Sequence, residues 1–546
     1  MPKIVLEHVT KRWNNFYGVD DLNLVMDDNS FVTLLGPSGC GKTTTLRMIA
    51  GLETPTSGKI TIGDHVVFDS NQGINVPASK RRVGFLFQNY ALWPNMTVYQ
   101  NISFGLKNVK EEMSIIDYDL KNCNRIMQIL KKPKEIIELI KDCADKKGNI
   151  EDKKVLIHLV DNYEISMYTA KEIYGFKLNE KEDYVSAANE IYKTYENRWK
   201  DIQLKNAKKN VELNDNYEVI KDGKPVIKER KLDKEEIDLA VRRVSRVVKI
   251  GEFMDRYPSE LSGGQQQRVA IARTLAPAPH VLFMDEPLSN LDAKLRLEMR
   301  GELQRLHAST GSTFVYVTHD QLEAMTLATK ICLINNGVLQ QYDAPLEVYK
   351  KPNNLFVADF VGNPSINFVE TKVRQDKNGS IKVKFFKDRE LTFVPNEKID
   401  LDAWRANEDK IIKEKNAIDD KKKKDKGYVE KSNKDVTFKY HTPMVNENPV
   451  DDEYIIQNDD FVLAIRPEFI KFGHEKGQLD GIIYSSMPTG METTVRINID
   501  EYLITGVMFG GAAFKLDESI KVSFESNGIL LYDRKTGKLV CSGSLK

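Results

Sequence analysis

Short runs of consecutive hydrophobic residues recur along the chain and predict buried strands. The clearest are Phe31–Leu35, Val83–Phe87, Val281–Met284 and Phe314–Val317. Each run is too short for a helix and is rich in branched or aromatic side chains. Between the runs the hydrophobic spacing changes to three and four residues, as in Val269–Leu275, which indicates helices. Alternating strands and helices predict a mostly parallel α/β sheet with ligands at the strand ends.

Hydrophobic and polar residues alternate with a period of two in other regions. Residues 4–35 follow this pattern and have a turn signal at Asn14 and Asn15. Residues 366–396 and 456–546 hold short alternating runs, such as Ile381–Phe385, separated by glycine turns. This pattern predicts a small antiparallel β-barrel in the C-terminal part of the chain.

An insertion at residues 111–231 interrupts the α/β pattern. It is rich in Lys, Asn and Glu, but its hydrophobic residues fall on helix faces. One face spans Tyr184 to Ile202, and a second lies around Ile136–Ile140. Asp222 and Gly223 form a hairpin signal. These patterns favour a mainly helical lobe over a disordered loop.

A second insertion covers residues 397–455. It contains the run Lys421–Lys424 and few apolar residues, a composition that predicts mostly disorder. A lysine run is most often a solvated linker, and contact with anionic lipid is the weaker alternative.

Composition narrows the class of protein. A chain of 546 residues is expected to hold two or three domains. Its formal net charge is zero, so no global field would recruit nucleic acid or an anionic membrane. There is no run of 18 apolar residues, and no signal peptide is expected. The five cysteines are scattered and cannot all pair, which indicates reduced thiols in a cytosolic setting.

The segment Gly36–Thr43 fits the phosphate-loop pattern G-x-x-x-x-G-K-[ST], with a strand before it and a helix start after it. Its glycines let backbone N–H groups point at phosphate oxygens. Lys42 would supply a mobile charge for the outer phosphates, and the Thr43 hydroxyl can bind Mg²⁺. Alone, this motif predicts nucleoside triphosphate binding.

Trp13 stands before the phosphate loop. An exposed aromatic residue at this place can stack on adenine, with Phe16 and Tyr17 as competitors and ordinary packing as the alternative.

The remaining polar motifs follow much later in the chain. Leu261–Arg268 reads Leu-Ser-Gly-Gly-Gln-Gln-Gln-Arg and opens a helix. Asp285 and Glu286 close a buried strand, Ser289–Asp292 follows, and His319 comes directly after another strand.

In this order, the motifs resemble those of ATP-binding-cassette ATPases, and finer detail resembles the importers of maltose and glycerol 3-phosphate. The resemblance covers roughly residues 1–110, 232–395 and 456–546. The stretches that carry the finer likeness are Phe87–Pro94, Tyr257–Leu261, Leu288–Ala293, Asp320–Met325, Phe360–Pro364 and Ile465–Glu468.

The resemblance implies an α/β fold, a P-loop cassette ATPase with an α-helical subdomain. Residues 1–110 and 232–365 would form the nucleotide-binding domain, split by the helical insertion 111–231. Residues 366–396 and 456–546 would form a regulatory antiparallel barrel of the oligonucleotide-binding type, interrupted by the charged segment 397–455. This barrel type does not imply nucleic-acid binding.

The resemblance also implies roles for residues. Glu286, His319 and Gln88 would be catalytic, with Glu286 orienting or deprotonating the attacking water. Mg²⁺ would be bound by Thr43, Gln88 and Asp285. The ATP-binding residues would be Trp13, Gly36, Pro37, Ser38, Gly39, Cys40, Gly41, Lys42, Thr43, Thr44, Ser262, Gly263, Gly264, Gln265 and Asp292.

The implied partners follow from this assignment. Ser262–Gly264 would face the phosphate loop of a second copy, or of a paralogous ATPase subunit, and Asp292 would link the two sites. Two integral-membrane permease subunits would complete a transporter, served by an extracellular solute-binding protein. The chain would be peripheral, on the cytoplasmic face of the membrane, and would bind no nucleic acid.

The transported solute is not encoded in this chain. A sugar or glycerol 3-phosphate is favoured over a polyamine. A soluble cassette ATPase acting on DNA ends would carry a coiled coil in place of the insertion, but residues 111–231 contain Pro133 and Pro225 and no sustained heptads. A ribosome-acting ATPase would carry two cassettes, and a non-catalytic scaffold would not need Lys42 or Glu286.

Overall fold

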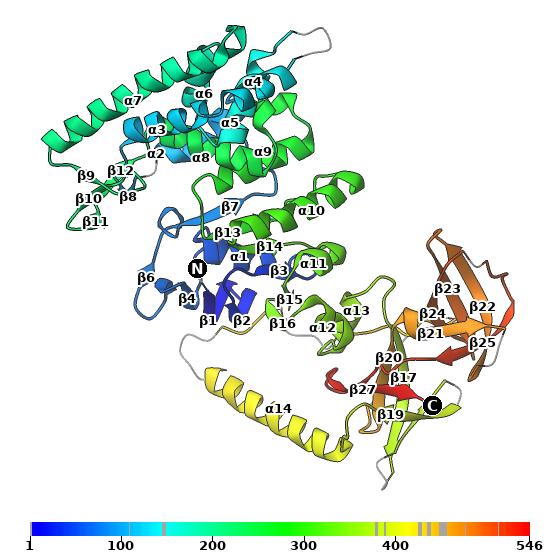
Figure 1. Cartoon of the computed structure of the whole chain (residues 1–546). Helices are drawn as coiled ribbons and strands as arrows, with labels where there is room; N and C mark the ends of the chain where they lie inside the picture. The colour runs from blue at the N-terminus through cyan, green and yellow to red at the C-terminus, as the bar shows by residue number, and fades with distance from the viewer. Residues whose placement is uncertain are drawn as a thin grey trace. The chain divides into compact units, whose positions relative to one another are not determined.

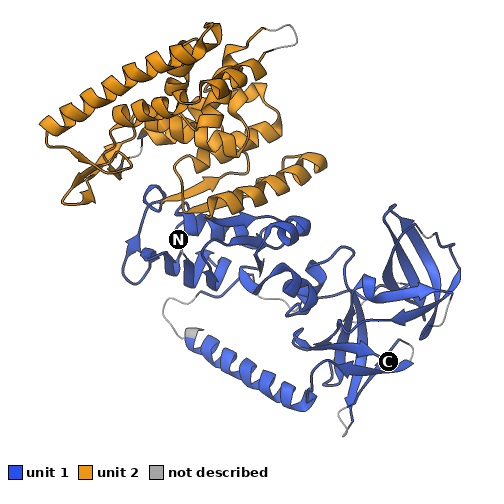
Figure 2. Ribbon diagram, in the orientation of Figure 1, with its two compact units in different colours: residues 1–81, 313–546 blue, residues 82–312 orange. Residues whose placement is uncertain are grey.

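The structure is a computed structural model that describes residues 3–108, 110–144, 149–376, 380–386, 389–423, 429–433, 438–446, 456–474, 477–511 and 513–546. The chain forms two compact units. The first holds residues 1–81 and 313–546, and the second holds residues 82–312 (Figure 2). This division differs from the predicted one, which groups 1–110 with 232–365. The domain boundaries suggested by the sequence stay predictions.

A hydrophobic sheet in the first unit has the strand order β16, β15, β3, β14. β3 (Phe31–Leu35) runs parallel to β14 (Thr313–Val317) and to β15 (Lys330–Asn335). β16 (Val338–Asp343) is antiparallel to β15. Helix α1 (Lys42–Ala50) follows β3, and α11 (Gln321–Leu327) follows β14 (Figure 1). The predicted strands and their alternation with helices are confirmed here.

The second sheet of the first unit carries the N-terminal hairpin. Its strands, in spatial order, are β2 (Phe16–Met26), β1 (Ile4–Trp13), β4 (Ser57–Ile62), β5 (His65–Asp69) and β6 (Ile74–Asn75). β1 and β2 are antiparallel, Trp13 is paired with Phe16, and Asn14 has a φ of 54°. The predicted turn at Asn14 and Asn15 is confirmed, and β2 is left as an edge strand.

Residues 367–395 and 460–545 of the first unit form antiparallel β-sheets, as predicted. A closed barrel consists of β17 (Asn367–Gln375), β18 (Ile381–Phe385), β19 (Arg389–Pro395), β27 (Leu539–Leu545), β26 (Ile529–Asp533) and β20 (Asp460–Ile465). A further sheet consists of β21 (Ile470–Gly473), β25 (Ser519–Phe524), β22 (Leu479–Pro488), β23 (Glu492–Ile499) and β24 (Tyr502–Phe509). Inward-facing aliphatic and aromatic side chains of both share one core. The barrel is consistent with the oligonucleotide-binding type.

Arg466 joins this region to two short helices, α12 (Pro345–Lys350) and α13 (Leu355–Phe360). Its buried guanidinium donates to the carbonyl oxygens of Tyr349 at 2.9 Å and Ala358 at 3.3 Å, and also to that of Val361. The guanidinium lies 4.0 Å from the centre of the Tyr349 ring. This buried cation is tolerated because several carbonyls accept from its two terminal NH₂ groups.

Helix α14 (Leu401–Lys423) corrects the prediction of disorder for residues 401–423 of the segment 397–455. Asp400 caps its start by accepting hydrogen bonds from the backbone N–H groups of Asp402 and Ala403, each 3.0 Å long. Leu401 packs into the barrel core, and the Lys538 ammonium donates to Glu408 at 2.6 Å. The prediction used the average composition of residues 397–455, which does not reveal a few contact residues at helical spacing. Residues 424–428, 434–437 and 447–455 of this prediction lie outside the described residues.

The second unit contains a parallel strand pair and a set of helices. β13 (Val281–Asp285) runs beside β7 (Val83–Leu86). The helices outside the insertion are α2 (Val98–Asn108), α8 (Lys234–Val247), α9 (Gly263–Leu275) and α10 (Ala293–Thr310).

The insertion 111–231 is a mainly helical lobe, as predicted. Its helices are α3 (Tyr118–Leu130), α4 (Pro133–Asp142), α5 (Asp152–Tyr163), α6 (Met167–Gly175) and α7 (Tyr184–Lys208). They enclose a hydrophobic core of their own. β10 (Val219–Lys221) lies between β9 (Glu212–Leu213) and β11 (Lys224–Pro225) and turns into β11 at Asp222 and Gly223, which confirms the hairpin. β8 (Lys110–Ser114) pairs with β12 (Ile227–Lys231), so the two ends of the lobe meet.

Among the helices that the structure describes, none combines the length and the apolar character needed to cross a membrane.

Candidate active site

The phosphate loop runs from the end of β3 to the start of α1 and depends on glycine. Gly36 has a φ of 152°, Gly39 of 79° and Gly41 of 103°. A Cβ added to Gly36 would lie 2.1 Å from the carbonyl oxygen of Ile334, and one added to Gly41 would lie 2.1 Å from that of Gly18. No side chain fits at these two places. The loop therefore has the backbone shape that a phosphate cradle requires.

Lys42 is the first residue of α1, and its side chain is 5% exposed. Its ammonium donates to the carbonyl oxygens of Gly36 at 2.8 Å and Pro37 at 2.7 Å, and lies 3.8 Å from the Cys40 sulfur. Burial raises the pKa of the Cys40 thiol, although the Lys42 charge opposes the shift. The neutral Cys40 thiol fills space beside the loop. The Lys42 ammonium lies inside the loop, where phosphate oxygens can replace the carbonyl oxygens as its hydrogen-bond acceptors.

His319 emerges at the same sheet edge as the phosphate loop. β14 and β3 are parallel, with Val317 beside Leu34, so both strands deliver their next residues to one edge. Asp320 holds the turn by capping α11, accepting from the N–H of Leu322 at 2.8 Å. The His319 side chain is exposed. Within the first unit, the structure thus brings the predicted histidine to the edge that carries the phosphate loop.

Trp13 and Phe16 present a pair of aromatic rings at the tip of the β1–β2 hairpin. Their ring centres are 6.5 Å apart and the planes differ by 27°. Trp13 is 44% exposed and Phe16 is 43% exposed. The Lys11 ammonium lies 5.2 Å from the centre of the Trp13 ring. These two rings, called the aromatic tip below, offer flat faces for a nucleotide base.

Glu286 and Gln88 lie together in the second unit. β13 and β7 are parallel, so Asp285–Glu286 and Gln88 follow strands that end at one edge. The Gln88 side-chain amide is 3.4 Å from Glu286 Oε2 and 3.4 Å from Ser289 Oγ. Glu286 has a φ of 45°, a left-handed conformation that costs free energy in a non-glycine residue and is often found where chemistry occurs. Asp285 is 6% exposed.

Ser262 begins helix α9 with a capping box. Its hydroxyl accepts from the Gln265 N–H at 3.4 Å, and the Gln265 side chain accepts from the Ser262 N–H at 2.9 Å. Ser262 and Gly263 are exposed, whereas a Cβ on Gly264 would lie 2.7 Å from the Leu295 side chain. The result is a rigid helix N-terminus with exposed glycine backbone, which is suited to an anion.

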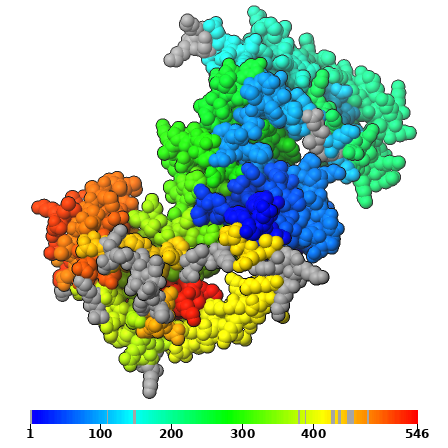
Figure 3. Space-filling model, turned by 180° about the vertical axis from the view of Figure 1, so that it is seen from behind, coloured from blue at the N-terminus to red at the C-terminus, as the bar shows by residue number. Residues whose placement is uncertain are grey.

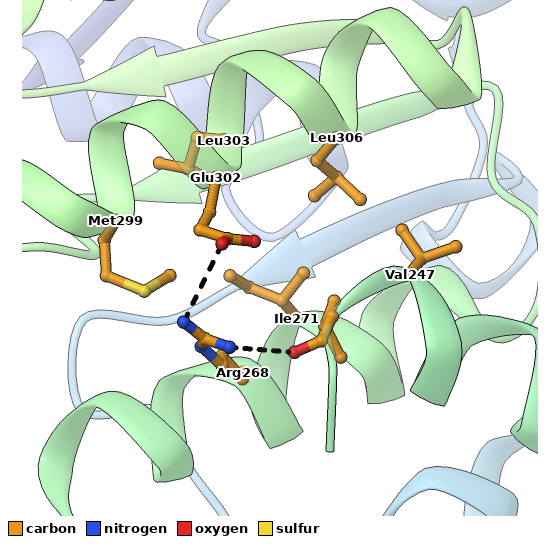
Figure 4. A pocket seen from close by; sticks show the side chains of 8 residues that line it. Val247, Arg268, Ile271, Met299, Glu302, Leu303 and Leu306 are labelled. Atoms are coloured by element: carbon orange, nitrogen blue, oxygen red, sulfur yellow. Dashed lines mark hydrogen bonds and ion pairs between the residues drawn. The ribbon is translucent and has the colours of Figure 1, made fainter. Parts of the chain in front are cut away.

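Asp292 caps α10 by accepting from the Leu295 N–H at 2.8 Å. Helices α9 and α10 are joined behind these caps by Arg268, which is 3.9 Å from the Glu302 carboxylate and 3.4 Å from the Val248 carbonyl (Figure 4). The cavity beside Arg268 measures about 10 Å³, too small for more than one water. Arg268 therefore serves to hold the two capped helices together.

Comparison with known proteins places this geometry in a family. A profile described as ABC transporter matches residues 19–162 and 170–289. A trehalose/maltose import ATP-binding protein of Thermococcus litoralis is 35% identical over 407 residues, which span 73% of this chain and 77% of that protein. The chain belongs to the ATP-binding cassette transporter family.

Two further members illustrate the range of similar cassette proteins. An sn-glycerol-3-phosphate import ATP-binding protein of Brucella abortus is 33% identical, with 68% of this chain and 70% of that protein covered. A spermidine/putrescine import ATP-binding protein of Ureaplasma parvum is 34% identical, with 66% and 77% covered.

One residue of the cassette was missed by sequence reasoning. Glu323 is buried on α11, and its Oε2 accepts from the Tyr316 hydroxyl at 2.7 Å and from the Thr318 hydroxyl at 2.8 Å. It therefore braces the strand end that carries His319. The sequence does contain a signal for this residue. Glu323 falls on the apolar side of a short helix, beside Ala324 and Leu327, and a buried carboxylate needs a hydrogen-bond partner.

We expect Gly41→Ala to abolish ATP binding, because its Cβ would meet the Gly18 carbonyl and force the phosphate loop to move. Gly39→Ala is the matched control. Gly39 also has a positive φ, but its added Cβ meets no described atom within 4 Å. Equilibrium binding of a fluorescent ATP analogue compares the two. Equal losses in both variants would show that the close approach at Gly41 is unimportant.

Proposed function

We propose that this chain binds ATP with Mg²⁺, hydrolyses it, and drives solute uptake as a peripheral subunit on the cytoplasmic face of the membrane. The observation that carries the proposal is the glycine-dependent phosphate loop with the Lys42 ammonium held inside it. Two permease subunits would translocate the solute, which an extracellular solute-binding protein would deliver.

The residues at the strand ends suit phosphoryl transfer, which depends on positioning and charge neutralisation. Lys42 and the loop N–H groups would hold the outer phosphates. Thr43, Gln88 and Asp285 offer hard oxygen donors, the type that Mg²⁺ prefers, and the bound ion would neutralise phosphate charge.

Glu286 would orient or deprotonate the attacking water. Gln88, within reach of the Glu286 carboxylate, would share that water, and His319 would contact the γ-phosphate.

A second copy would complete each site. Ser262 and Gly263 expose helix N-terminal backbone, and an anion is the natural ligand for such a group. In a twofold-symmetric pair, this N-terminus of one copy would cover the nucleotide held by the phosphate loop of the other. Gly264 and Gln265 would complete that surface, and Asp292 would act at the junction of the two sites.

The solute is proposed from the similar proteins. The Thermococcus and Brucella proteins are named for trehalose/maltose and glycerol 3-phosphate, so a sugar or glycerol 3-phosphate is the first candidate. The Ureaplasma protein, named for spermidine and putrescine, supports a polyamine as the second candidate.

Affinity purification of the tagged chain from detergent-solubilised membranes tests the importer assignment. Integral-membrane permease subunits are expected to co-purify. ATPase activity of the complex in vesicles should then rise with maltose or glycerol 3-phosphate together with the binding protein. Stimulation by spermidine would favour the second candidate, and recovery of DNA or ribosomes in place of permeases would contradict both.

Glu286→Gln should retain ATP binding but lower turnover by roughly 10²–10⁴, the usual contribution of a general base. Steady-state ATPase and nucleotide binding are measured side by side. Glu298→Gln, an exposed position on α10, is the control and should behave as wild type. Turnover within threefold of wild type in Glu286→Gln would contradict the catalytic role.

Ser262→Arg should leave nucleotide binding by the monomer intact but block ATP-driven dimerisation, because a large cation would cover the exposed helix N-terminus. Size-exclusion chromatography in a Glu286→Gln background, with ATP and without Mg²⁺, is the measurement. Ser262→Ala also loses the cap but adds no bulk, so it separates the two effects. A normal dimer peak for Ser262→Arg would refute the two-copy site.

A further inference from the structure

Residues 429–433, part of the second insertion, bind the β1–β2 hairpin beside the aromatic tip, at Asn15, Tyr17 and Asp20. This segment is called the strap. It belongs to the same unit as the β1–β2 hairpin. Figure 3 shows yellow atoms from this part of the chain beside the dark blue atoms of the N-terminal strands. The strap runs along the edge strand β2, whose outer backbone groups are available for pairing.

The strap forms hydrogen bonds with the backbone groups on both sides of Phe16. The Ser432 N–H and hydroxyl donate to the Asn15 carbonyl oxygen at 2.9 and 3.1 Å. The Asn433 amide accepts from the Tyr17 N–H at 3.0 Å and donates to the Tyr17 carbonyl at 2.8 Å. Asn433 thus pairs with Tyr17 as a neighbouring strand would. Phe16 stands between two fixed peptide groups.

A charged contact adds to these hydrogen bonds. The Lys431 ammonium forms an ion pair with Asp20 and lies 5.5 Å from the centre of the Tyr17 ring. The Tyr17 hydroxyl donates to the Val429 carbonyl at 3.0 Å. The strap therefore binds the hairpin over residues 15–20 through side chains and backbone together.

The clamped stretch of β2 also contacts the phosphate loop. Asp20 donates its N–H to the Gly337 carbonyl at 2.9 Å, and Gly337 donates to the Cys40 carbonyl at 3.0 Å. The Gly18 carbonyl oxygen lies only 2.1 Å from the position that a Cβ of Gly41 would take. The strap is thus separated from the phosphate loop by one strand.

The chain is anchored on both sides of the strap, to α13 and to the C-terminal sheets. Before it, α14 begins on the barrel, where Arg405 lies 4.6 Å from the centre of the Phe461 ring. After it, Phe438 packs against Phe356 with ring centres 5.7 Å apart, and Pro443 accepts from the Leu503 N–H at 2.8 Å. The insertion therefore connects the C-terminal sheets to the hairpin.

We propose that the strap is a positioning element for the nucleotide base, and that Ser432, Asn433 and Lys431 set base affinity by holding the aromatic tip. The proposal rests on the proposed function, ATP binding, and on the expectation from the sequence that an aromatic ring of the tip stacks on adenine. The strap residues act through the tip and touch no phosphate, so their effect is confined to ligands that carry a base.

Binding of ATP and of inorganic tripolyphosphate, which lacks a base, tests this selectivity. Both are titrated by calorimetry into the full-length protein with EDTA, which prevents turnover. Asn433→Ala removes two hydrogen bonds and is expected to weaken ATP binding about fivefold to tenfold, while tripolyphosphate binding stays unchanged. Asn396→Ala is the matched control, since Asn396 also makes two side-chain hydrogen bonds, to Asn527 and Ser542, on the barrel. It should bind both ligands as wild type.

A double-mutant cycle locates the effect. In a Trp13→Ala/Phe16→Ala background, Asn433→Ala should cause no further loss of ATP affinity. A further loss there, or an equal loss for tripolyphosphate, would overturn the positioning role. If removing both rings leaves ATP affinity unchanged, base stacking itself is wrong and the strap proposal fails with it. If ring removal weakens ATP binding but Asn433→Ala does not, only the strap proposal fails.

A charge exchange gives an independent variant in case Asn433→Ala disturbs folding. Lys431→Glu should weaken ATP binding and spare tripolyphosphate. Adding Asp20→Lys should restore ATP affinity, because the ion pair reforms with its signs reversed. Failure of this rescue, with ATP affinity still low, would contradict the proposal.

Discussion

The close approach of backbone to backbone around the phosphate loop is the constraint on which the rest of the first unit depends. Gly36 lies against the Ile334 carbonyl and Gly41 against the Gly18 carbonyl, with no space for a Cβ at either contact. The loop is thus wedged between β15 and β2. Its shape is therefore set by two sheets at once.

The candidate catalytic residues follow strand ends in both units in the same way. Parallel pairing brings His319 to the edge that holds the phosphate loop, and brings Gln88 to the edge that holds Glu286. The polar side chains at these ends are then fixed by short-range contacts, such as the cap of Asp320 and the buried Glu323 carboxylate. Hydrophobic strands determine where reactive groups emerge, and local hydrogen bonds determine how they point.

Features encoded within a few residues were predictable from sequence, and features that join distant segments were not. The phosphate loop, the Asn14–Asn15 turn and the helix face of α7 depend on neighbouring residues, and the structure has all of them. The strap pairs residues 15–20 with 429–433, and no local pattern marks that pairing. Composition predicted disorder around α14 because charge averaged over 397–455 conceals its few docking residues. Glu323 escaped notice because Tyr316 lies in β14 and Thr318 directly follows it, and this segment has the pattern of a purely structural strand.

The pairing of β8 with β12 has a consequence for how the chain tolerates its large insertion. These strands leave the cassette and return to it side by side, about 5 Å apart, the spacing of any antiparallel ladder. For the path of the chain, the helical lobe is therefore equivalent to the tip of one β-hairpin. The ladder fixes where the chain leaves and returns, whatever the size of the lobe above it, and the lobe adds contacts of its own to α8, such as the hydrogen bond from the Met167 N–H to Asp238 at 2.6 Å.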